Sequence, residues 1–466
     1  MQIEYADSAK TETVCCHRES EAERGFVIAV SRAECAMNYG RGRHDASMTR
    51  CGVSALILVA LLALPPPASA YSVLAHESMI DAVWDDTIAP ILMARFGASD
   101  AAMIAKARAY AYGGSVMPDM GYYPFGSRFF TNLLHYTRSG DFVEALIRDA
   151  RNVNEYAFAL GTLAHYVADS TGHPRGVNPA VAIQYPKLRA RFGDDVTYAE
   201  DRKRHVRVEF AFDVVQVARG SYLPQAYRDF IGFEIPKHLV ERAFRETYGL
   251  EMKDIFASED LAIGTFRYAV GAAIPQMTQV AWQQKRHEIE RLAPNVERNA
   301  FVYVYPPHQY EEDFGTTYRR PGLFARFFVW VVRVIPKVGP FKVLGFRTPT
   351  DETEQLLAGS LRSSHQSYRA ALDRLSQNSL QLLNMDFDTG EVTMHGEYSL
   401  ADDTYAELLN RLTSKDAADV PDAIRADIVR FFGPVNSLDA QDKKARKAHA
   451  KIEQQLARLN EPPATR

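Results

Sequence analysis

The sequence predicts an all-α protein. Through residues 71–290, apolar side chains recur at spacings of three and four, which is the periodicity of one buried face of a helix. A clear example is the run Ala157, Leu160, Leu163, Ala164 and Val167. Breakers divide the pattern into separate helices at Gly113-Gly114, Pro118, Pro124-Phe125-Gly126 and Gly172-His173-Pro174. Neither βαβ alternation nor an internal repeat is found, and 466 residues are enough to bury a substantial core.

Residues 1–70 indicate export. The apolar run 53–64 follows Arg50, is broken by three prolines, and ends in Ala68-Ser69-Ala70, which is typical of a signal-peptidase site. We therefore expect a signal peptide over 48–70, an upstream extension over 1–47 from a misassigned start, and Tyr71 as the first residue of a periplasmic or secreted protein. An uncleaved anchor is the alternative.

The cysteines restrict the metal chemistry. All four lie before Tyr71, at Cys15, Cys16, Cys35 and Cys51. Any zinc in the mature chain would therefore have to be held by nitrogen and oxygen alone. The formal net charge of -4 provides no global basic field for nucleic acid, although a metal site supplies positive charge locally.

The segment 291–350 differs from the residues before it. Residues 323–337 are strongly apolar and aromatic, and Arg326, Arg333 and Lys337 fall on roughly one helical side. Such a segment suits a membrane interface, or equally a core helix whose cations reach out to solvent. It is too short and too charged for a transmembrane span.

Helices are expected again over 351–466. Leu372, Leu375, Leu380 and Leu383 indicate one helix, and the charged tail 441–458 is expected to be solvated. The acidic stretch 386–391 is too short for an EF-hand loop, and we interpret it as a turn.

Histidine and carboxylate pairs within 71–290 have the spacing of metal ligands. His165 and Asp169 are four residues apart, as are His205 and Glu209, so each pair lies on one helix face. A single such pair is common by chance, and the second follows three basic residues that also suit an exposed, salt-bridged face. The hypothesis of a metal site therefore depends on the whole set of histidines and acids.

Taken in order, nine positions resemble the zinc-dependent phospholipase C family, which shares its fold and site with the single-strand-specific zinc nucleases. They are Tyr71, His76, Asp119 in Met-Pro-Asp, His135 in Leu-His-Tyr, His165, Asp169, His173, His205 and Glu209. The resemblance covers about residues 71–290 and implies a mostly helical zinc phospholipase C/nuclease-like domain, followed here by a helical C-terminal extension. The family usually begins with Trp and has a longer gap between the residues that correspond to Asp169 and His173.

The resemblance also implies up to three zinc ions. One ion would take Asp119, His135, His165 and Asp169. A second would share Asp169 as a bridge and take His76 with the amine and carbonyl of Tyr71, and a third would take His173, His205 and Glu209. The signal-peptide cleavage, inferred independently, places a free amine at Tyr71, where the family needs it.

The expected activity is hydrolysis of a phosphodiester by a metal-activated water, since zinc lowers the pKa of bound water to about 7. Asp119 is expected to be a ligand, the general base, or both. The apolar segment around Trp330 favours a phospholipid or membrane-surface substrate. One alternative is a nuclease that stacks bases on Tyr122, Tyr123 and Phe125. Another is a non-catalytic, membrane-associated binding protein stabilised by zinc, against which the His and carboxylate ligand set argues.

Overall fold

A computed structural model describes residues 73–97, 100–219, 233–270, 346–414, 420–433 and 443–460, with a few isolated positions between 282 and 296. All of them belong to the compact unit Pro65–Arg466. The signal segment, Tyr71 and the apolar segment 323–337 lie outside the described residues. The predictions made for them therefore remain predictions.

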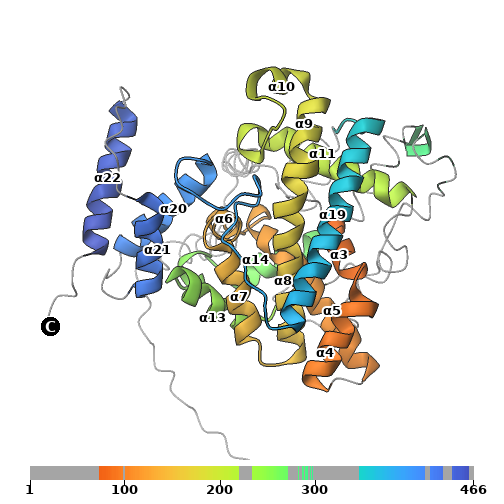
Figure 1. The fold of residues 1–466 in the computed structure, drawn as a ribbon, viewed down its shortest axis with the longest axis horizontal. Helices are drawn as coiled ribbons and strands as arrows, with labels where there is room; N and C mark the ends of the chain where they lie inside the picture. The colour runs from red at the N-terminus through yellow and green to blue at the C-terminus, as the bar shows by residue number, and fades with distance from the viewer. Residues whose placement is uncertain are drawn as a thin grey trace, which may run out of the picture. The chain divides into compact units, whose positions relative to one another are not determined.

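The prediction of an all-α fold is confirmed (Figure 1). The described residues contain no β-strand, and their one isolated bridge joins Met385 and Val392. The helices that precede the C-terminal region are α3 Val73–Asp81, η1 Trp84–Ile88, α4 Ala89–Phe96, α5 Ala101–Val116, η2 Met117–Tyr122, α6 Arg128–Tyr136, α7 Ser139–Asp149, α8 Val153–Gly172, η3 His173–Val177, α9 Asn178–Gln184, α10 Pro186–Phe192, α11 Tyr198–Arg219, α13 Lys237–Tyr248, η4 Met252–Asp254 and α14 Glu259–Tyr268. The C-terminal helices are α19 Asp351–Ser376, α20 Ser399–Ser414, α21 Asp422–Phe432 and α22 Lys443–Leu459.

Helix α8 is the central element. The side chain of Asn152 caps its N-terminus by accepting hydrogen bonds from the amides of Asn154 and Glu155. Most of its residues are buried, because α3, α5, α7 and α19 all pack against it. In Figure 1 α19 runs beside α8, although more than 150 residues separate the two helices in the sequence.

Two sequence expectations about helix boundaries were wrong. Gly113 and Gly114 lie inside α5 and do not end it. A Cβ on Gly114 would lie 2.0 Å from the carbonyl oxygen of Phe158, so the glycine allows α5 to approach the backbone of α8. Leu380 and Leu383 lie beyond the end of α19 at Ser376 and do not extend it.

The predicted break at 172–174 marks the end of α8, and the chain continues directly into the π-helical turn η3, with Pro174 in its first turn. The turn predicted over 386–391 is confirmed. The side chain of Asp386 accepts hydrogen bonds from the amides of Asp388 and Thr389, and Gly390, at φ +70°, completes the reversal.

Among the described residues, no single helix is long and apolar enough to cross a membrane. The segments Trp84–Phe96 and Ala101–Tyr122 meet at a bend of 116°. They reach the length and apolar composition of a membrane span only when they are taken together.

Candidate metal centre

Eight of the nine predicted site residues lie within the described residues, and the fold brings all eight together. Each is at most 1% exposed. They come from five parts of the chain: His76 from α3, Asp119 from η2, His135 from α6, His165, Asp169 and His173 from α8 and the start of η3, and His205 and Glu209 from α11. Tyr71, the ninth, is outside the described residues.

Three of these side chains follow one face of α8. His165, Asp169 and His173 are successively four residues apart, so they lie one above another on the helix. The spacing of four residues between Asp169 and His173 keeps the two side chains on the same face. The Nε2 atom of His173 is 3.8 Å from Oδ1 of Asp169.

The carboxylate of Asp169 lies between different histidines. Its Oδ1 is 3.4 Å from Nε2 of His76, whereas its Oδ2 is 3.1 Å from Nε2 of His165 and 3.5 Å from Nε2 of His135. The rings of His76 and His165 stack with their centroids 4.2 Å apart. The two oxygens of Asp169 therefore face two groups of ring nitrogens, as a bridging carboxylate requires.

A fixed turn positions Asp119. Thr131 on α6 accepts a hydrogen bond from the amide of Gly121 at 2.9 Å and donates one to the carbonyl of Pro118 at 2.6 Å, which ties η2 to α6. Oδ1 of Asp119 is 3.4 Å from Nε2 of His135, and its Oδ2 is 4.0 Å from Nε2 of His76. The Met-Pro-Asp turn thus places the carboxylate of Asp119 beside the histidines that surround Asp169.

Backbone carbonyls hold the outer nitrogens of two histidines. Nδ1 of His135 is 2.9 Å from the carbonyl oxygen of Thr131, and Nδ1 of His165 is 2.9 Å from that of Ser115. A carbonyl only accepts, so each ring carries its proton on Nδ1 when it is neutral. Nε2 then carries a lone pair that is directed toward the carboxylates. Metal-binding histidines have this arrangement, in which one ring nitrogen donates to a carbonyl and the other binds the metal.

The third cluster depends on a kink in α11. Asp201 has a non-helical backbone (φ -153°, ψ 83°), and its side chain accepts a hydrogen bond from the amide of Arg204. Asp201 thereby caps the straight part of the helix that carries His205 and Glu209. Oε1 of Glu209 is 3.0 Å from Nε2 of His205 and 3.5 Å from Nε2 of His173.

Burial and neighbouring charges shift the pKa values of the clustered histidines and carboxylates in different directions. Burial opposes the charged form of His135, but Asp119 and Asp169 outweigh that effect and raise its pKa to about 10. Burial likewise opposes ionisation of Asp169, yet the surrounding histidines hold its pKa well below the usual value. The pKa of His76 is lowered well below its usual value, first by burial and then by His165.

The donor set fits metal ions. Both carboxylate oxygens of Asp169 and of Glu209, and both ring nitrogens of His205, are buried without a hydrogen bond of good geometry. Leaving such groups unsatisfied is costly, and a cation is the partner that satisfies carboxylates and imidazoles together. Three groups have ligand atoms close enough to share one ion: His76, His165 and Asp169; Asp119, His135 and His165; and His173, His205 and Glu209.

Comparison with known proteins agrees with this geometry. Residues 75–258 match the model of a family described as zinc dependent phospholipase C. This segment of the chain is similar to the zinc-dependent phospholipase C family. No curated protein and no solved structure matches it. All eight converging residues fall inside the family segment, which assigns the domain to zinc-dependent hydrolases of the phospholipase C type.

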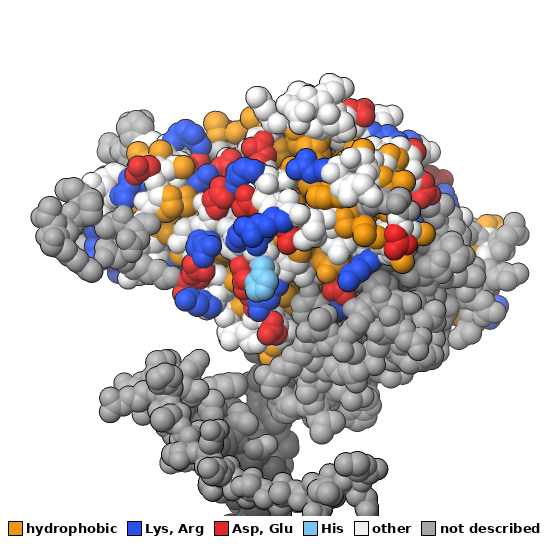
Figure 2. Space-filling model, turned by 90° about the horizontal axis from the view of Figure 1, so that it is seen from below, with side chains coloured by type: hydrophobic (Ala, Val, Ile, Leu, Met, Phe, Trp, Pro, Cys, Tyr) orange, Lys and Arg blue, Asp and Glu red, His pale blue; other side chains and the backbone are white. Residues whose placement is uncertain are grey.

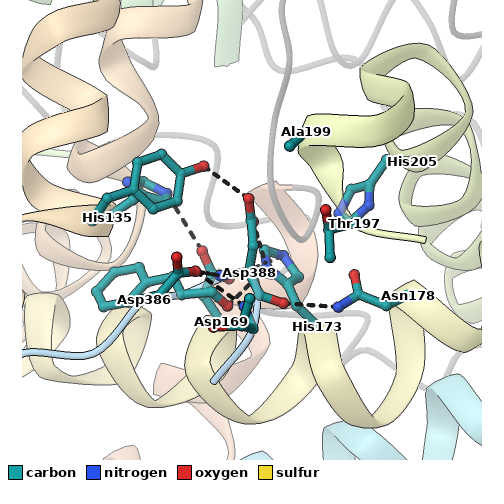
Figure 3. A network of polar contacts seen from close by, with 12 residues as sticks. His135, Asp169, His173, Asn178, Thr197, Ala199, His205, Asp386 and Asp388 are labelled. Carbon is teal, nitrogen blue, oxygen red and sulfur yellow. Dashed lines mark hydrogen bonds and ion pairs between the residues drawn. The ribbon is translucent and has the colours of Figure 1, made fainter. Parts of the chain in front are cut away.

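One part of the site lies outside the family segment, and the sequence analysis did not find it. The turn after α19 places Asp388 with Oδ1 3.1 Å from Nδ1 of His173 (Figure 3). Phe387 packs on His135 and His165, with ring centroids 5.1 and 5.9 Å away. The only signal in the sequence was an aromatic residue between two acids, and this was interpreted as a turn without a link to the histidines.

Proposed function

We propose that this chain is an exported zinc-dependent phosphodiester hydrolase that cleaves phospholipids in the manner of a phospholipase C. The observation that carries the proposal is the buried convergence of His and carboxylate side chains into three groups whose ligand atoms are close enough to share an ion, within a segment matched to the zinc-dependent phospholipase C family. Export is supported by the signal-like segment 48–70.

The distances support a division of the ligands among three ions. Asp119, His135, His165 and Asp169 would hold the first, and His173, His205 and Glu209 the third. His76 and the second oxygen of Asp169 would hold another ion with the backbone of Tyr71. His165 also lies close enough to His76 to serve this second group, since their rings stack.

When bound, zinc supplies a Lewis acid for the phosphoryl oxygens and a low pKa for the attacking water. The chain's own residues supply the orientation. Asp169 directs one oxygen to each of two histidine groups, so the positive charge of two sites can be held on either side of one carboxylate. Asp119 is the candidate proton acceptor, because it lies at the edge of this cluster and burial raises the pKa of its carboxyl above the usual value, although His135 opposes that shift.

The aromatic residues favour a lipid over a single-stranded nucleic acid. The ring of Tyr122 packs between His135 and Tyr198, and Tyr123 packs against Phe266 with centroids 4.5 Å apart. Of the three residues considered for base stacking, only Phe125 is largely exposed, at 49%. They therefore do not form the row of exposed rings on which successive bases stack.

The charges also give no support to a nucleic-acid surface. Among the described residues on the face shown in Figure 2, basic and acidic side chains are intermixed and do not gather into a basic stripe. The net charge of -4 agrees with this. A purely structural role for zinc is less suited to the ligand set, because structural sites are usually closed by cysteine. No cysteine follows Cys51 in the chain.

The first experiment is elemental analysis of the purified chain, combined with hydrolysis of a chromogenic choline phosphodiester, phosphatidylcholine vesicles and single-stranded DNA. We expect two to three zinc ions per chain and chelator-sensitive release of phosphocholine that added zinc restores. Preferential cleavage of DNA would assign the nuclease alternative. A chain that binds no zinc and hydrolyses none of the three substrates would contradict the proposal.

A further inference from the structure

The turn 386–391 is part of the wall of the metal centre, although it lies more than 120 residues beyond the family segment. The amide of Phe387 donates a hydrogen bond to the carbonyl of His135 at 3.1 Å, and its own carbonyl lies 3.1 Å from Nδ1 of His173. A Cβ on Gly390 would lie 2.5 Å from the carbonyl oxygen of Ser170, so the turn is seated directly against the end of α8.

The carboxylate of Asp388 is held on every side. It is 2% exposed, and its Oδ2 accepts a hydrogen bond from the hydroxyl of Tyr136 at 2.9 Å and another from that of Tyr398. The backbone carbonyl of Asp388 accepts a hydrogen bond from Nδ2 of Asn178 at 2.8 Å (Figure 3). With Oδ2 engaged by two hydroxyls, Oδ1 is directed at Nδ1 of His173, 3.1 Å away.

We propose that Asp388 is a positioning residue that keeps the proton of His173 on Nδ1, so that Nε2 presents its lone pair to the third ion. The inference rests on the proposed function and extends it, because it makes a segment outside the family domain part of the metal site.

The physical reason lies in the imidazole. A neutral imidazole ring has one donor nitrogen and one acceptor nitrogen. An acceptor placed beside Nδ1 makes Nδ1 the donor and Nε2 the acceptor. His135 and His165 meet neutral backbone carbonyls at Nδ1, whereas His173 meets a carboxylate as well. A carboxylate partner orients the ring and increases its basicity, and so strengthens the bond that the opposite nitrogen makes to a metal.

The position of Nε2 fits this role. It points away from Asp388 and lies 3.5 Å from Oε1 of Glu209 and 3.8 Å from Oδ1 of Asp169. Nδ1 of His173 has two acceptors, Oδ1 of Asp388 and the carbonyl oxygen of Phe387, each 3.1 Å away. The carboxylate is the stronger acceptor because it is charged. Without it the proton is held less firmly at Nδ1 and more of it resides on Nε2, where it would be directed at the carboxylates of Glu209 and Asp169 and would block metal ligation. Asp388 thus favours the tautomer that binds a metal over the one that pairs with Glu209.

The test compares Asp388→Asn with the wild-type full chain. Zinc affinities are measured by competition with a chelator. The coordination of each metal site is compared through the absorption spectra of the cobalt-substituted proteins. The amide oxygen of Asn can satisfy the two tyrosine hydroxyls, which turns its NH2 toward His173 and demands the wrong tautomer. We expect one bound ion to lose affinity by about tenfold to a hundredfold, as other outer partners of metal ligands do, with the remaining ions and their cobalt spectra unchanged.

Asp386→Asn is the matched control. It makes the same isosteric change two residues away and keeps the Oδ1 acceptor that holds the turn. The side chain of Asp386 holds the turn through the amides of Asp388 and Thr389, so we expect the variant to retain all ions at wild-type affinity. If it loses the same ion as Asp388→Asn, the effect belongs to the turn as a whole and the inference is overturned.

A second variant covers the case in which Asp388→Asn does not fold. In Asp388→Ala, added formate should restore the lost affinity, whereas formamide of the same size should not. Unaltered zinc affinity in both Asp388 variants would overturn the inference while the proposed function stands. A wild-type chain that binds no zinc would instead overturn the proposed function.

Discussion

Asp169 is the side chain on which the contacts of the site converge. Histidines from α3, α6, α8 and the start of η3 all lie within 3.8 Å of its two oxygens. The two oxygens of one carboxylate can bridge two ligand groups here because the partners are held in place by helices. Single substitutions here test the site more directly than any change in the surrounding core.

Asp169→Asn is expected to remove most of the activity. The amide can present only one oxygen, so one of the two histidine groups loses its anionic partner. Since substitution of an outer partner alone costs about tenfold to a hundredfold, we expect a loss of about a hundredfold or more in kcat/KM and fewer zinc ions per chain. Asp194→Asn is the control, because Asp194 is 76% exposed and pairs only with Arg189. Full activity of Asp169→Asn would contradict the bridging role.

His365 on α19 should make the fold sensitive to acid. Burial, with Arg369 as a further cause, lowers the pKa of His365 from 6.5 to about 4. Between these values the unfolded chain binds a proton that the folded chain does not, so stability falls as the pH drops from 6.5 towards 4. The shift corresponds to at most about 3 kcal/mol.

His365→Gln is expected to remove that part of the acid sensitivity. Urea unfolding of both proteins at pH 7 and pH 4.5 measures it, and the difference between the two proteins isolates this residue because the metal-site histidines are common to both. Identical pH dependence would show that His365 is solvated in the folded state.

At the scale of elements, the pairing of α5 with α8 places the first histidines. A Cβ on Gly161 of α8 would lie 1.9 Å from the carbonyl oxygen of Ala111 and 3.0 Å from the amide of Ser115 on α5. This close approach brings the carbonyl of Ser115 within 2.9 Å of Nδ1 of His165. Packing between two helices therefore sets the tautomer of a ligand.

Gly161→Ala should separate the two helices. We expect a loss of about 1–3 kcal/mol or more from overpacking, together with weaker zinc binding, because the carbonyl of Ser115 moves away from His165. Gly359→Ala in α19 is the control: its Cβ would meet only Arg362, at 3.8 Å. A helix interior favours Ala over Gly by about 0.5–1 kcal/mol, so this variant should be neutral or stabilised. Denaturant unfolding and zinc titration of both variants measure these effects. If Gly161→Ala keeps the wild-type free energy of unfolding and zinc affinity, α5 can move away from α8 without loss of stability.

At the scale of the molecule, the C-terminal helices complete the core of the family segment. The hydroxyl of Tyr368 on α19 donates a hydrogen bond to the carbonyl of Leu160 on α8 at 2.8 Å, and Tyr368 and Leu372 are both fully buried. The same compact unit holds both regions. The C-terminal region thus packs directly on α8, which with the start of η3 carries three of the proposed ligands.

A chain that ends at residue 345 should therefore fail to form the site. It would expose the face of α8 that α19 covers, and we expect a poorly soluble or non-cooperative protein without bound zinc. Supplying residues 346–466 as a separate polypeptide should restore zinc binding. Of the described helices, a chain that ends at residue 433 lacks only α22, which packs against α20, and it should keep its zinc. Cooperative unfolding and full zinc content of the shorter chain would contradict this role of α19.

Much of the site could be predicted from local pattern. His165 with Asp169, and His205 with Glu209, share a helix face because of their spacing alone, and the structure shows them at 3.1 and 3.0 Å. The helix boundaries were less predictable. Gly113 and Gly114 were expected to break a helix, but tight packing against α8 makes glycine suitable inside α5.

The sequence by itself determined the helical class, the chemistry of the candidate ligands and their order along the chain, because periodicity and residue type are local properties. Only the tertiary structure decided that α3, η2, α6, α8 and α11 deliver those ligands to one buried place. It also decided that Asp388 meets His173 across 215 positions of sequence. No local spacing encodes such a contact, because it exists only after α19 has packed along α8 and carried the following turn back to the site.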